Sequence, residues 1–350
     1  MEMQIGPVIA DVAGQTLTQD DIELLKHPSL GGIILFARNY DNPEQVMDLI
    51  KHIRMIRPRC FITVDQEGGR VQRFVTGLTK LPPMQSLGRL FDEQQLNAES
   101  VLKVVKQIGQ LMAMELRSLG VDLSFAPVLD LATDLNPVVK TRAIHSDPAI
   151  VNLLASHYVD GMLLAGMQAC GKHFPGHGKV TADSHLSLPV DLRDFSEITD
   201  DLLPFAHLIK HGIASIMTGH LIFPKIEKLP ATFSPYWLQT ILRDKLKFNG
   251  AIICDDLNMD ATKELGDPVM CAKLALSAGS DYILICNNRP QAEKILSSIT
   301  ASFDPKVVER RERLLSDPKT MIPWEKLHQH TEWKEARNAL EQIGSWDTLQ

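Results

Sequence analysis

The sequence predicts an α/β protein folded as a single-domain (β/α)8 TIM barrel, and three observations lead to this prediction. Eight short apolar runs alternate with longer segments of helical period. The runs are rich in Val, Ile, Leu and Phe with little polar alternation, which is typical of parallel strands buried on both faces. No internal repeat or linker divides the 350 residues. A doubly wound open sheet is the alternative fold.

The predicted strands fill the first four fifths of the chain, and we place the barrel over about residues 5–300. In order they are Pro7–Val12, Gly31–Phe36, Cys60–Val64, Val121–Leu131, Ala169–His173, Ala214–Thr218, Gly250–Cys254 and Asp281–Cys286. In the C-terminal tail, residues 305–350, the sequence predicts helices that pack outside the barrel, over Val307–Leu315 and after Trp324. We therefore expect one domain over residues 1–350.

Predicted helices lie between the strands, and several carry start and stop signals. Thr18 precedes Asp20 and Asp21, Pro begins several helices, and Gly279 follows one of them. The helices are, in order, Thr18–Lys26, Pro43–Ile56, Glu99–Leu119, Pro148–Met167, Asp200–His211, Pro235–Leu246, Pro268–Ala278 and Pro290–Ser298.

Composition and charge exclude several functional classes. The chain has 36 Lys and Arg against 43 Asp and Glu, so it lacks the excess of cations that nucleic-acid binding uses. No stretch approaches the roughly 18 apolar residues of a membrane helix, and no signal peptide is recognisable. The five cysteines are scattered and odd in number, which argues against disulfides and favours a reducing compartment. We expect a cytoplasmic monomer without nucleic-acid or membrane partners.

Polar side chains follow the predicted strands at the points where the strands end. In a (β/α)8 barrel these ends and their loops form the active-site face, so the side chains would converge on one pocket. A single polar residue at a barrel mouth is ordinary, but this set contains both carboxylates and cations and indicates an enzyme. The set comprises Asp11, Arg38, Asn39, Asp65, Asp130, Lys172, His173, His220, Asp255, Asp256, Asn287 and Asn288.

The segment Val64–Arg73 has residue types that bind a sugar. Asp65, at a strand end, can accept hydrogen bonds from two neighbouring hydroxyl groups, and Arg73 can donate several. The paired glycines between them allow a tight turn. An Asp and an Arg that pair only within that turn would give the same pattern.

A loop rich in Gly and Pro follows the strand that ends near Lys172. Residues 172–185 include three His and one Asp, a density that is unusual for structural histidines. Asp183 and His185 can form a carboxylate–imidazole pair in which the carboxylate orients the ring. Pro and Gly in the loop would let it close over a substrate.

The segment Gly250–Met259 is an apolar strand that ends in two carboxylates. Asp255 stands where it can attack the electrophilic carbon of a sugar. The alternative is that one of the two carboxylates caps the next helix, and Asp256 is the better candidate for that cap.

These segments together resemble the family 3 glycoside hydrolases of the β-N-acetylglucosaminidase (NagZ) type. The similar blocks occur in the same order and are Val64–Phe74, Ser124–Asp130, Lys172–Gly178, Asp183–His185, Asp255–Met259 and Cys286–Asn288. The resemblance implies a cytoplasmic single-domain barrel that acts on a small amino-sugar substrate. It implies that the enzyme removes terminal N-acetylglucosamine from 1,6-anhydromuropeptides during cell-wall recycling.

The same resemblance implies roles for individual residues. Asp255 would be the catalytic nucleophile, His185 the acid/base and Asp183 its supporting carboxylate. The sugar-binding residues would be Asp65, Arg73, Arg142, Lys172 and His173.

The chain departs from the family pattern just before Arg142. The family usually has Gly and an acidic residue where this chain has Lys140 and Thr141. The segment His145–Pro148 keeps the alignment in place, so we expect Arg142 to keep its role and the shape of its loop to differ.

Retaining glycosidases form a covalent glycosyl intermediate and hydrolyse it with one group that acts first as acid and then as base. Asp255 would form the intermediate. The ordinary pKa of a His, about 6.5, suits both roles of His185, and Asp183 favours its imidazolium. Glu67 is the competing candidate for the acid. This chemistry requires neither a metal ion nor an organic cofactor.

Two further functional classes are alternatives. A metal-dependent hydrolase of the same fold generally has a His-x-His at an early strand end, whereas the first strand here is followed by Asp11. Its candidate ligands would be His173, His177, Asp183, His185, His220 and Asp255. A non-catalytic sugar-binding protein would not explain a carboxylate–imidazole pair alongside a second carboxylate.

Overall fold

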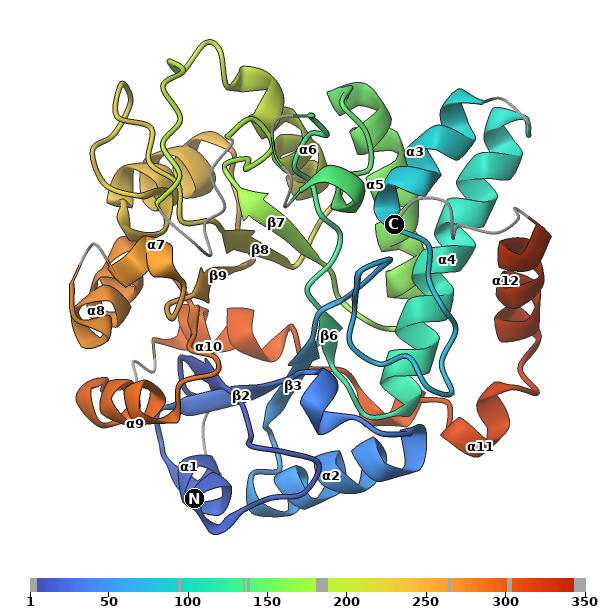
Figure 1. The fold of residues 1–350 in the computed structure, drawn as a ribbon, viewed down its shortest axis with the longest axis horizontal. Helices are drawn as coiled ribbons and strands as arrows, with labels where there is room; N and C mark the ends of the chain where they lie inside the picture. Colours follow the sequence, from blue (N-terminus) through green and yellow to red (C-terminus); the bar gives the residue numbers. More distant parts are fainter. Residues whose placement is uncertain are drawn as a thin grey trace.

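The computed structural model describes residues 5–93, 96–134, 136, 139–180, 188–263, 266–300 and 304–342. Eight parallel strands form one sheet, and Figure 1 shows them in the middle of the molecule with helices around them. In sheet order the strands are β6 Leu123–Ser124, β3 Phe61–Val64, β2 Leu30–Leu35, β1 Val8–Ala10, β10 Tyr282–Leu284, β9 Ala251–Asp256, β8 Ser215–Thr218 and β7 Cys170–Phe174.

Hydrogen bonds between the two ends of this order close the sheet into a barrel. The chain that follows β6 runs beside β7, where the Cys170 amide donates to the Ala126 carbonyl at 2.8 Å. The Leu129 amide donates to the Lys172 carbonyl at 2.6 Å, next to a parallel bridge from Val128 to Lys172. The predicted barrel is confirmed, and the alternative of an open sheet is wrong.

Every strand of the barrel contributes an apolar side chain to its interior. These side chains are Ile9, Ile34, Phe61, Leu123, Cys170, Met217, Ile253 and Leu284. The other faces of the strands join a second, larger cluster that includes the helices. Both faces are therefore buried, which is why the strand sequences lack polar alternation.

All eight predicted helices are present with ends close to those expected. They are α1 Gln19–Lys26, α2 Pro43–Ile56, α4 Ala98–Ser118, α5 Pro148–Leu164, α6 Thr199–Lys210, a π-helix at Tyr236–Lys245, α8 Pro268–Ala278 and α9 Arg289–Ser298. The start of α1 is a capping box, because the Thr18 hydroxyl accepts from the Asp21 amide and the Asp21 carboxylate accepts from the Thr18 amide. Two short helices, α3 Met84–Asp92 and α7 Asp260–Lys263, were not predicted.

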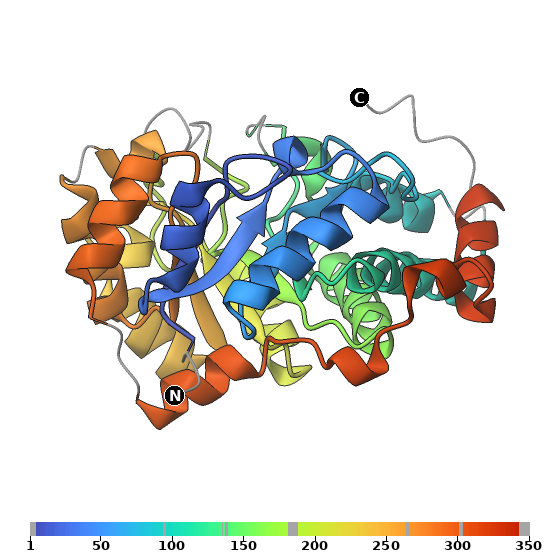
Figure 2. The same cartoon turned by 90° about the horizontal axis from the view of Figure 1, so that it is seen from below.

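The C-terminal helices pack outside the barrel, as expected. They are α10 Pro305–Glu312, α11 Trp324–Leu327 and α12 Thr331–Gln342, and Figure 2 shows α10 along the lower edge of the molecule. Arg311 of α10 donates to the carbonyls of Ile5 and Asp281, which stand just before β1 and β10. Leu314 joins the interior cluster. This helix therefore covers the amino ends of the strands and leaves their carboxyl ends open.

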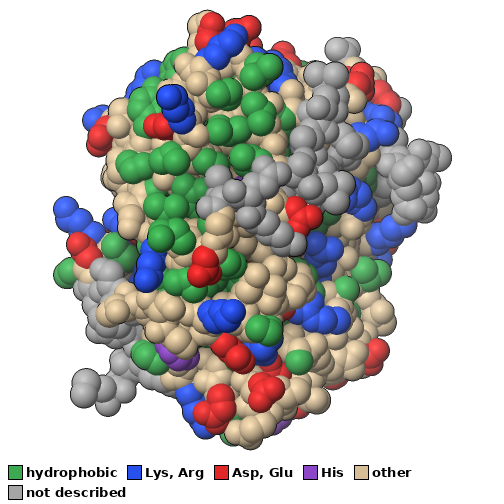
Figure 3. Space-filling model, turned by 60° about the vertical axis from the view of Figure 1, so that its left-hand side comes forward, with side chains coloured by type: hydrophobic (Ala, Val, Ile, Leu, Met, Phe, Trp, Pro, Cys, Tyr) green, Lys and Arg blue, Asp and Glu red, His purple; other side chains and the backbone are tan. Residues whose placement is uncertain are grey.

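Hydrophobic side chains gather on one face of the molecule in Figure 3. The exposed large apolar residues of the chain include Val190, Leu192, Met270 and Leu274. In the described part of the chain, no helix has both the length and the apolar character that crossing a membrane requires.

Candidate active site

The carboxyl ends of the strands open into a cleft of about 680 Å³. Six of the eight predicted site residues line it, namely Asp65, Arg73, Arg142, Lys172, His173 and Asp255. The other two, Asp183 and His185, lie within residues 181–187 and so outside the described residues. Residues from four separate segments of the chain therefore meet where the barrel prediction expected them to.

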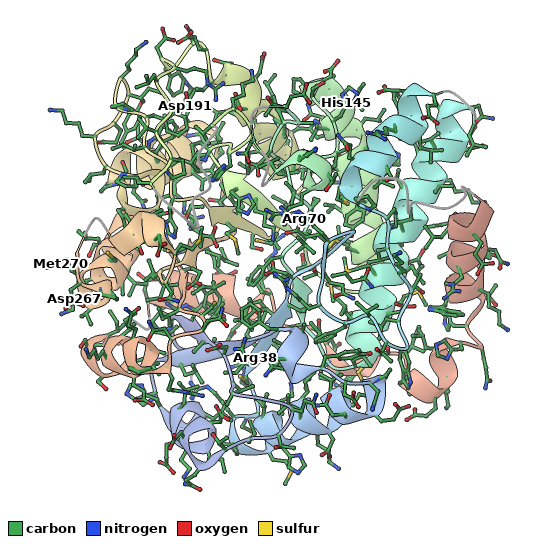
Figure 4. All side chains as sticks on the ribbon, viewed as in Figure 1. Arg38, Arg70, His145, Asp191, Asp267 and Met270 are labelled. Carbon is green, nitrogen blue, oxygen red and sulfur yellow. The ribbon has the colours of Figure 1, made fainter. Side chains whose placement is uncertain are left out.

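A short hairpin after β3 forms one wall of the cleft. It consists of β4 Gln66–Gly68 and β5 Val71–Gln72, and both glycines of its turn, Gly68 and Gly69, have positive φ. Arg70 follows them, lines the cleft and lies near the centre of the view in Figure 4. The paired glycines predicted this turn, although the two strands on either side of it were not predicted.

A network of charges joins the hairpin to strand β7 and to the short helix that ends at Arg142. Lys172 Nζ lies 2.9 Å from Asp65 and 2.5 Å from Glu67. Arg142 donates to both carboxylate oxygens of Glu67 from Nε and Nη2, at 2.8 Å each. Arg73 lies farther from Asp65, at 3.8 Å. Four of the predicted sugar-binding residues are thus held in one network, and Glu67 is its central anion.

The network keeps Glu67 ionised. Burial alone would raise the pKa of its carboxyl, but Arg142 and Lys172 outweigh burial and hold the pKa well below its ordinary value. Burial alone would likewise lower the pKa of Lys172, yet Asp65 and Glu67 raise it. Glu67 therefore has no proton to donate near neutral pH, and both of its oxygens are occupied by cations.

The unusual residues before Arg142 do not remove it from the cleft. Lys140–Arg142 forms a short 3-10 helix in which the Arg142 amide donates to the Val139 carbonyl at 2.6 Å. The Lys140 side chain is exposed, whereas only 10% of the Arg142 side chain is exposed. Arg142 therefore reaches the cleft, and the substituted residue Lys140 faces solvent.

Asp255 lies near the end of β9, and its charge is stabilised from several sides. Its Oδ1 accepts a hydrogen bond from the Asp256 amide at 2.8 Å. Burial alone would raise the pKa of Asp255, but His173, His220, that amide and Lys172 outweigh it and hold the pKa below its ordinary value. An ionised carboxylate in a cleft is the state that nucleophilic attack requires.

Asp256 does not cap a helix, contrary to the expectation. Its Oδ1 accepts from the amides of Asn258 and Cys286, at 3.0 and 2.9 Å, and α7 begins only at Asp260. The strand β9 continues through Asp256, so this carboxylate joins the strand end to the loop after β10. Burial raises the pKa of Asp256 to about 7.

Two histidines beside Asp255 are held by partners that lie far away in the sequence. His173 Nδ1 lies 2.7 Å from Asp130, whose other oxygen accepts from the His177 amide at 2.7 Å. His220 Nε2 lies 3.0 Å from the Asp256 carbonyl. The sequence marked Asp130 and His220 as polar residues after strands, and His220 also as a candidate metal ligand, but no sequence pattern links either residue to the partner it has here. Within the described ranges, no three His, Cys, Asp or Glu side chains are grouped so as to hold a metal ion.

The carboxyl ends of β1, β2 and β10 supply a second polar cluster at the mouth. Arg38, labelled in Figure 4, pairs with Asp11 and donates to Asn287 Oδ1 at 2.7 Å. Its guanidinium lies 4.8 Å from the ring centroid of Phe36, which lines the cleft. The prediction that polar residues after separate strands converge is confirmed here as well.

Comparison with known proteins decides the family. The family described as glycosyl hydrolase family 3 N terminal domain matches residues 3–316. The chain belongs to glycoside hydrolase family 3. A Beta-hexosaminidase of Thioalkalivibrio sulfidiphilus is 43% identical to this family 3 chain over 343 residues, which is 97% of each protein. One of Methylobacillus flagellatus is 42% identical over 349 residues, covering 99% of this chain and 98% of the relative.

Solved structures of family 3 members have the same fold. The crystal structure of NagZ from Neisseria gonorrhoeae in complex with N-trifluoroacetyl-D-glucosamine matches with a TM-score of 0.91 and 36% identity, over 98% of this chain and 99% of that one. A family 3 β-N-acetylglucosaminidase from Paenibacillus matches with a TM-score of 0.84 and 28% identity, over 98% of this chain and 68% of that one. This family 3 glycoside hydrolase is therefore an enzyme, a β-hexosaminidase of the NagZ type. The resemblance stated from the sequence is confirmed, and a metal-dependent hydrolase is not supported.

Proposed function

We propose that the enzyme is a retaining exo-β-N-acetylglucosaminidase of peptidoglycan recycling. Its substrate would be N-acetylglucosamine linked to 1,6-anhydro-N-acetylmuramic acid, with or without the peptide, from which it releases the terminal non-reducing sugar. The relatives are named Beta-hexosaminidase, and the Neisseria gonorrhoeae NagZ was crystallised with an N-acylated glucosamine. The observation that carries the proposal is the half-buried carboxylate of Asp255, whose pKa nearby charges hold below its ordinary value, in a cleft lined by cations and further carboxylates.

The reaction proceeds in two displacements. Asp255 attacks the anomeric carbon, the bond to the aglycone oxygen breaks, and His185 gives that oxygen a proton. Water then attacks the same carbon, His185 takes the proton, and Asp255 is released. Asp183 orients the ring of His185 and favours its imidazolium. The ion pairs of Glu67 support this assignment, because they leave that competing carboxylate without a proton to transfer.

The same cleft binds the non-reducing sugar. Asp65 accepts hydrogen bonds from ring hydroxyls, and the cations around it donate to sugar oxygens. We assign this role to Asp65, Arg73, Arg142, Lys172 and His173, all of which line the cleft. The lining carries charges of both signs, which suits a neutral, hydroxyl-rich sugar.

Trapping the intermediate tests the nucleophile. A fluorinated N-acetylglucosamine donor that slows deglycosylation should add one sugar to the enzyme, and peptide mass spectrometry should find it on Asp255. The Asp255→Ala variant should remain unlabelled and inactive while still binding N-acetylglucosamine. A label on Asp256 or Glu67 would show that the wrong carboxylate has been assigned.

We further propose that residues 1–350 form one catalytic domain that works as a cytoplasmic monomer without a cofactor. All five cysteines are buried and free, which suits a reducing compartment. Light scattering should give a mass near 39.0 kDa. A stable dimer, for which the apolar face in Figure 3 is the first candidate surface, would refute the monomer.

A further inference from the structure

His177 lies in the wall of the cleft and has no part in the proposed reaction. It follows β7, lines the cleft and is only 4% exposed. Its Nε2 is buried and has no hydrogen-bond partner among the described residues. Because leaving a buried polar atom unpaired costs free energy, such an atom beside a binding cleft indicates a ligand contact.

The contacts of Asn136 fix the orientation of its side-chain amide. Asn136 Nδ2 lies 2.7 Å from the His177 carbonyl oxygen, and Asn136 Oδ1 accepts from the Val139 amide at 3.1 Å. A carbonyl oxygen can only accept and a backbone N–H can only donate, so the amide has one orientation that satisfies both contacts.

That orientation decides which ring nitrogen of His177 carries the hydrogen. Asn136 Nδ2 also lies 3.0 Å from His177 Nδ1 and has a second hydrogen to donate to it. Nδ1 is therefore the unprotonated nitrogen, and Nε2 carries the hydrogen. The unpartnered atom is thus a hydrogen-bond donor.

The surroundings also keep the ring of His177 neutral. A proton on Nδ1 would place two donors, Nδ1–H and the Asn136 amide, against each other. Burial lowers the pKa of His177, although the charge of Asp130 opposes this effect. His177 is therefore suited to donate a hydrogen bond and not to transfer a proton.

The contact with Asn136 lies on the Nδ1 edge of the ring and leaves Nε2 unbonded. The Nδ1 edge of His177 faces Asn136, which is not among the cleft-lining residues, whereas the ring itself lines the cleft. The His173 ring lies edge-on to it with centroids 6.1 Å apart, and His173 Nδ1 is bound to Asp130.

We propose that His177 is a further substrate-binding residue of this enzyme, and that its Nε2–H donates to an oxygen of the bound amino sugar. The proposal rests on the proposed function, because it takes the cleft to be the sugar site. The acceptor is either the acetamido carbonyl oxygen or a ring or glycosidic oxygen.

Kinetics of two His177 variants test the proposal. His177→Phe keeps the size of the ring and removes both nitrogens, so kcat/KM for a chromogenic N-acetylglucosaminide should fall about two- to twelvefold, the range of one neutral hydrogen bond. His177→Gln keeps an N–H at a similar distance from the backbone and should recover part of the loss. His207→Phe is the matched control, since His207 bonds to Ser156 away from the cleft, and its kcat/KM should equal that of the wild type.

Imidazole nitrogen NMR of the wild-type enzyme gives a test that needs no variant to fold. The His177 signals should show the Nε2–H tautomer, and saturating N-acetylglucosamine should shift the Nε2–H resonance. An Nδ1–H tautomer, an unshifted resonance, or a wild-type kcat/KM in His177→Phe overturns the proposal. A loss that disappears with the corresponding glucoside identifies the acetamido oxygen as the acceptor, and a loss that persists identifies a ring or glycosidic oxygen. Absence of turnover by the wild type would instead refute the proposed function.

Discussion

Replacing Glu67 by Gln would keep the size of the side chain and remove the charge that two buried cations share. Glu67 is 2% exposed and lies 2.8 Å from Arg142 and 2.5 Å from Lys172. Removing one partner of a buried ion pair costs about 3–5 kcal/mol, because the other charge is left uncompensated. Lys172 keeps Asp65 as a partner at 2.9 Å, so we expect a loss near the lower end, about 3 kcal/mol.

The loss is measurable by thermal and denaturant unfolding. At about 2 °C per kcal/mol, the smaller shift typical of large domains, Tm should fall by roughly 6 °C. The matched control is Glu312→Gln, because Glu312 pairs with Arg59 at 2.7 Å with side chains 39% and 32% exposed. A pair this exposed is worth less than about 1 kcal/mol, so the control should unfold almost like the wild type.

The stability difference should also depend on pH. The pKa of Glu67 is lower in the folded protein than its ordinary value, so its stabilising effect is fully present above the unfolded pKa of about 4.3. It is lost as the pH falls below that value toward the folded pKa. The gap in unfolding free energy between wild type and Glu67→Gln should therefore be constant near neutral pH and shrink below about pH 4.

Kinetics separate this structural role from that of an acid. Glu67→Gln leaves Arg142 and Lys172 less firmly held, so it should raise KM and lower kcat/KM equally for substrates with good and poor leaving groups. Azide should restore no activity. Glu67 is the acid/base if the Glu67→Gln variant is as stable as Glu312→Gln, still hydrolyses substrates with good leaving groups at the wild-type rate, and regains activity with azide. The argument from its buried ion pairs would then be wrong.

Three further predictions test other parts of the site. Asp65→Ala should lower kcat/KM about ten- to a hundredfold even for small aryl glycosides, because a hydrogen bond to a charged group is worth about 1.5–3 kcal/mol. Unchanged steady-state kinetics would place Asp65 outside the site. His185→Ala should slow the hydrolysis of substrates with poor leaving groups far more than that of phenyl glycosides, and azide should restore its activity. Asp183→Ala should show a weaker version of the same pattern. If His185→Ala slows all substrates equally and azide restores nothing, His185 is a binding residue. Burial raises the pKa of Asp256 to about 7 in the folded protein, against about 3.9 in the unfolded chain. Between these values the folded state holds one more proton than the unfolded state, so the wild type loses stability as the pH rises from about 4 to 7. Asp256→Asn should remove that slope in urea unfolding, and parallel pH curves would contradict the assignment.

The strands and the main helices were predictable because their signals are local. A strand buried on both faces must be apolar along its whole length, and helix starts such as Thr18 and Asn42 carry their own capping groups. The β4–β5 hairpin and α7 were missed because each spans only a few residues, too few for a period to emerge. Asp256 was misassigned because β9 runs two residues farther than its apolar run.

The sequence by itself determined the barrel, the family resemblance and the positions of Asp65 and Asp255, since parallel strands in a closed barrel bring their carboxyl ends together. Only the tertiary structure decided which charges meet and in which protonation states. Glu67 and Arg142 are 75 residues apart, and Asn136 and His177 are 41 apart. Their pairing depends on distances through space after the barrel closes, and the pKa of each group depends on burial that no single segment can specify. The ionised carboxylate of Glu67 and the donor nitrogen of His177 are therefore properties of the folded chain.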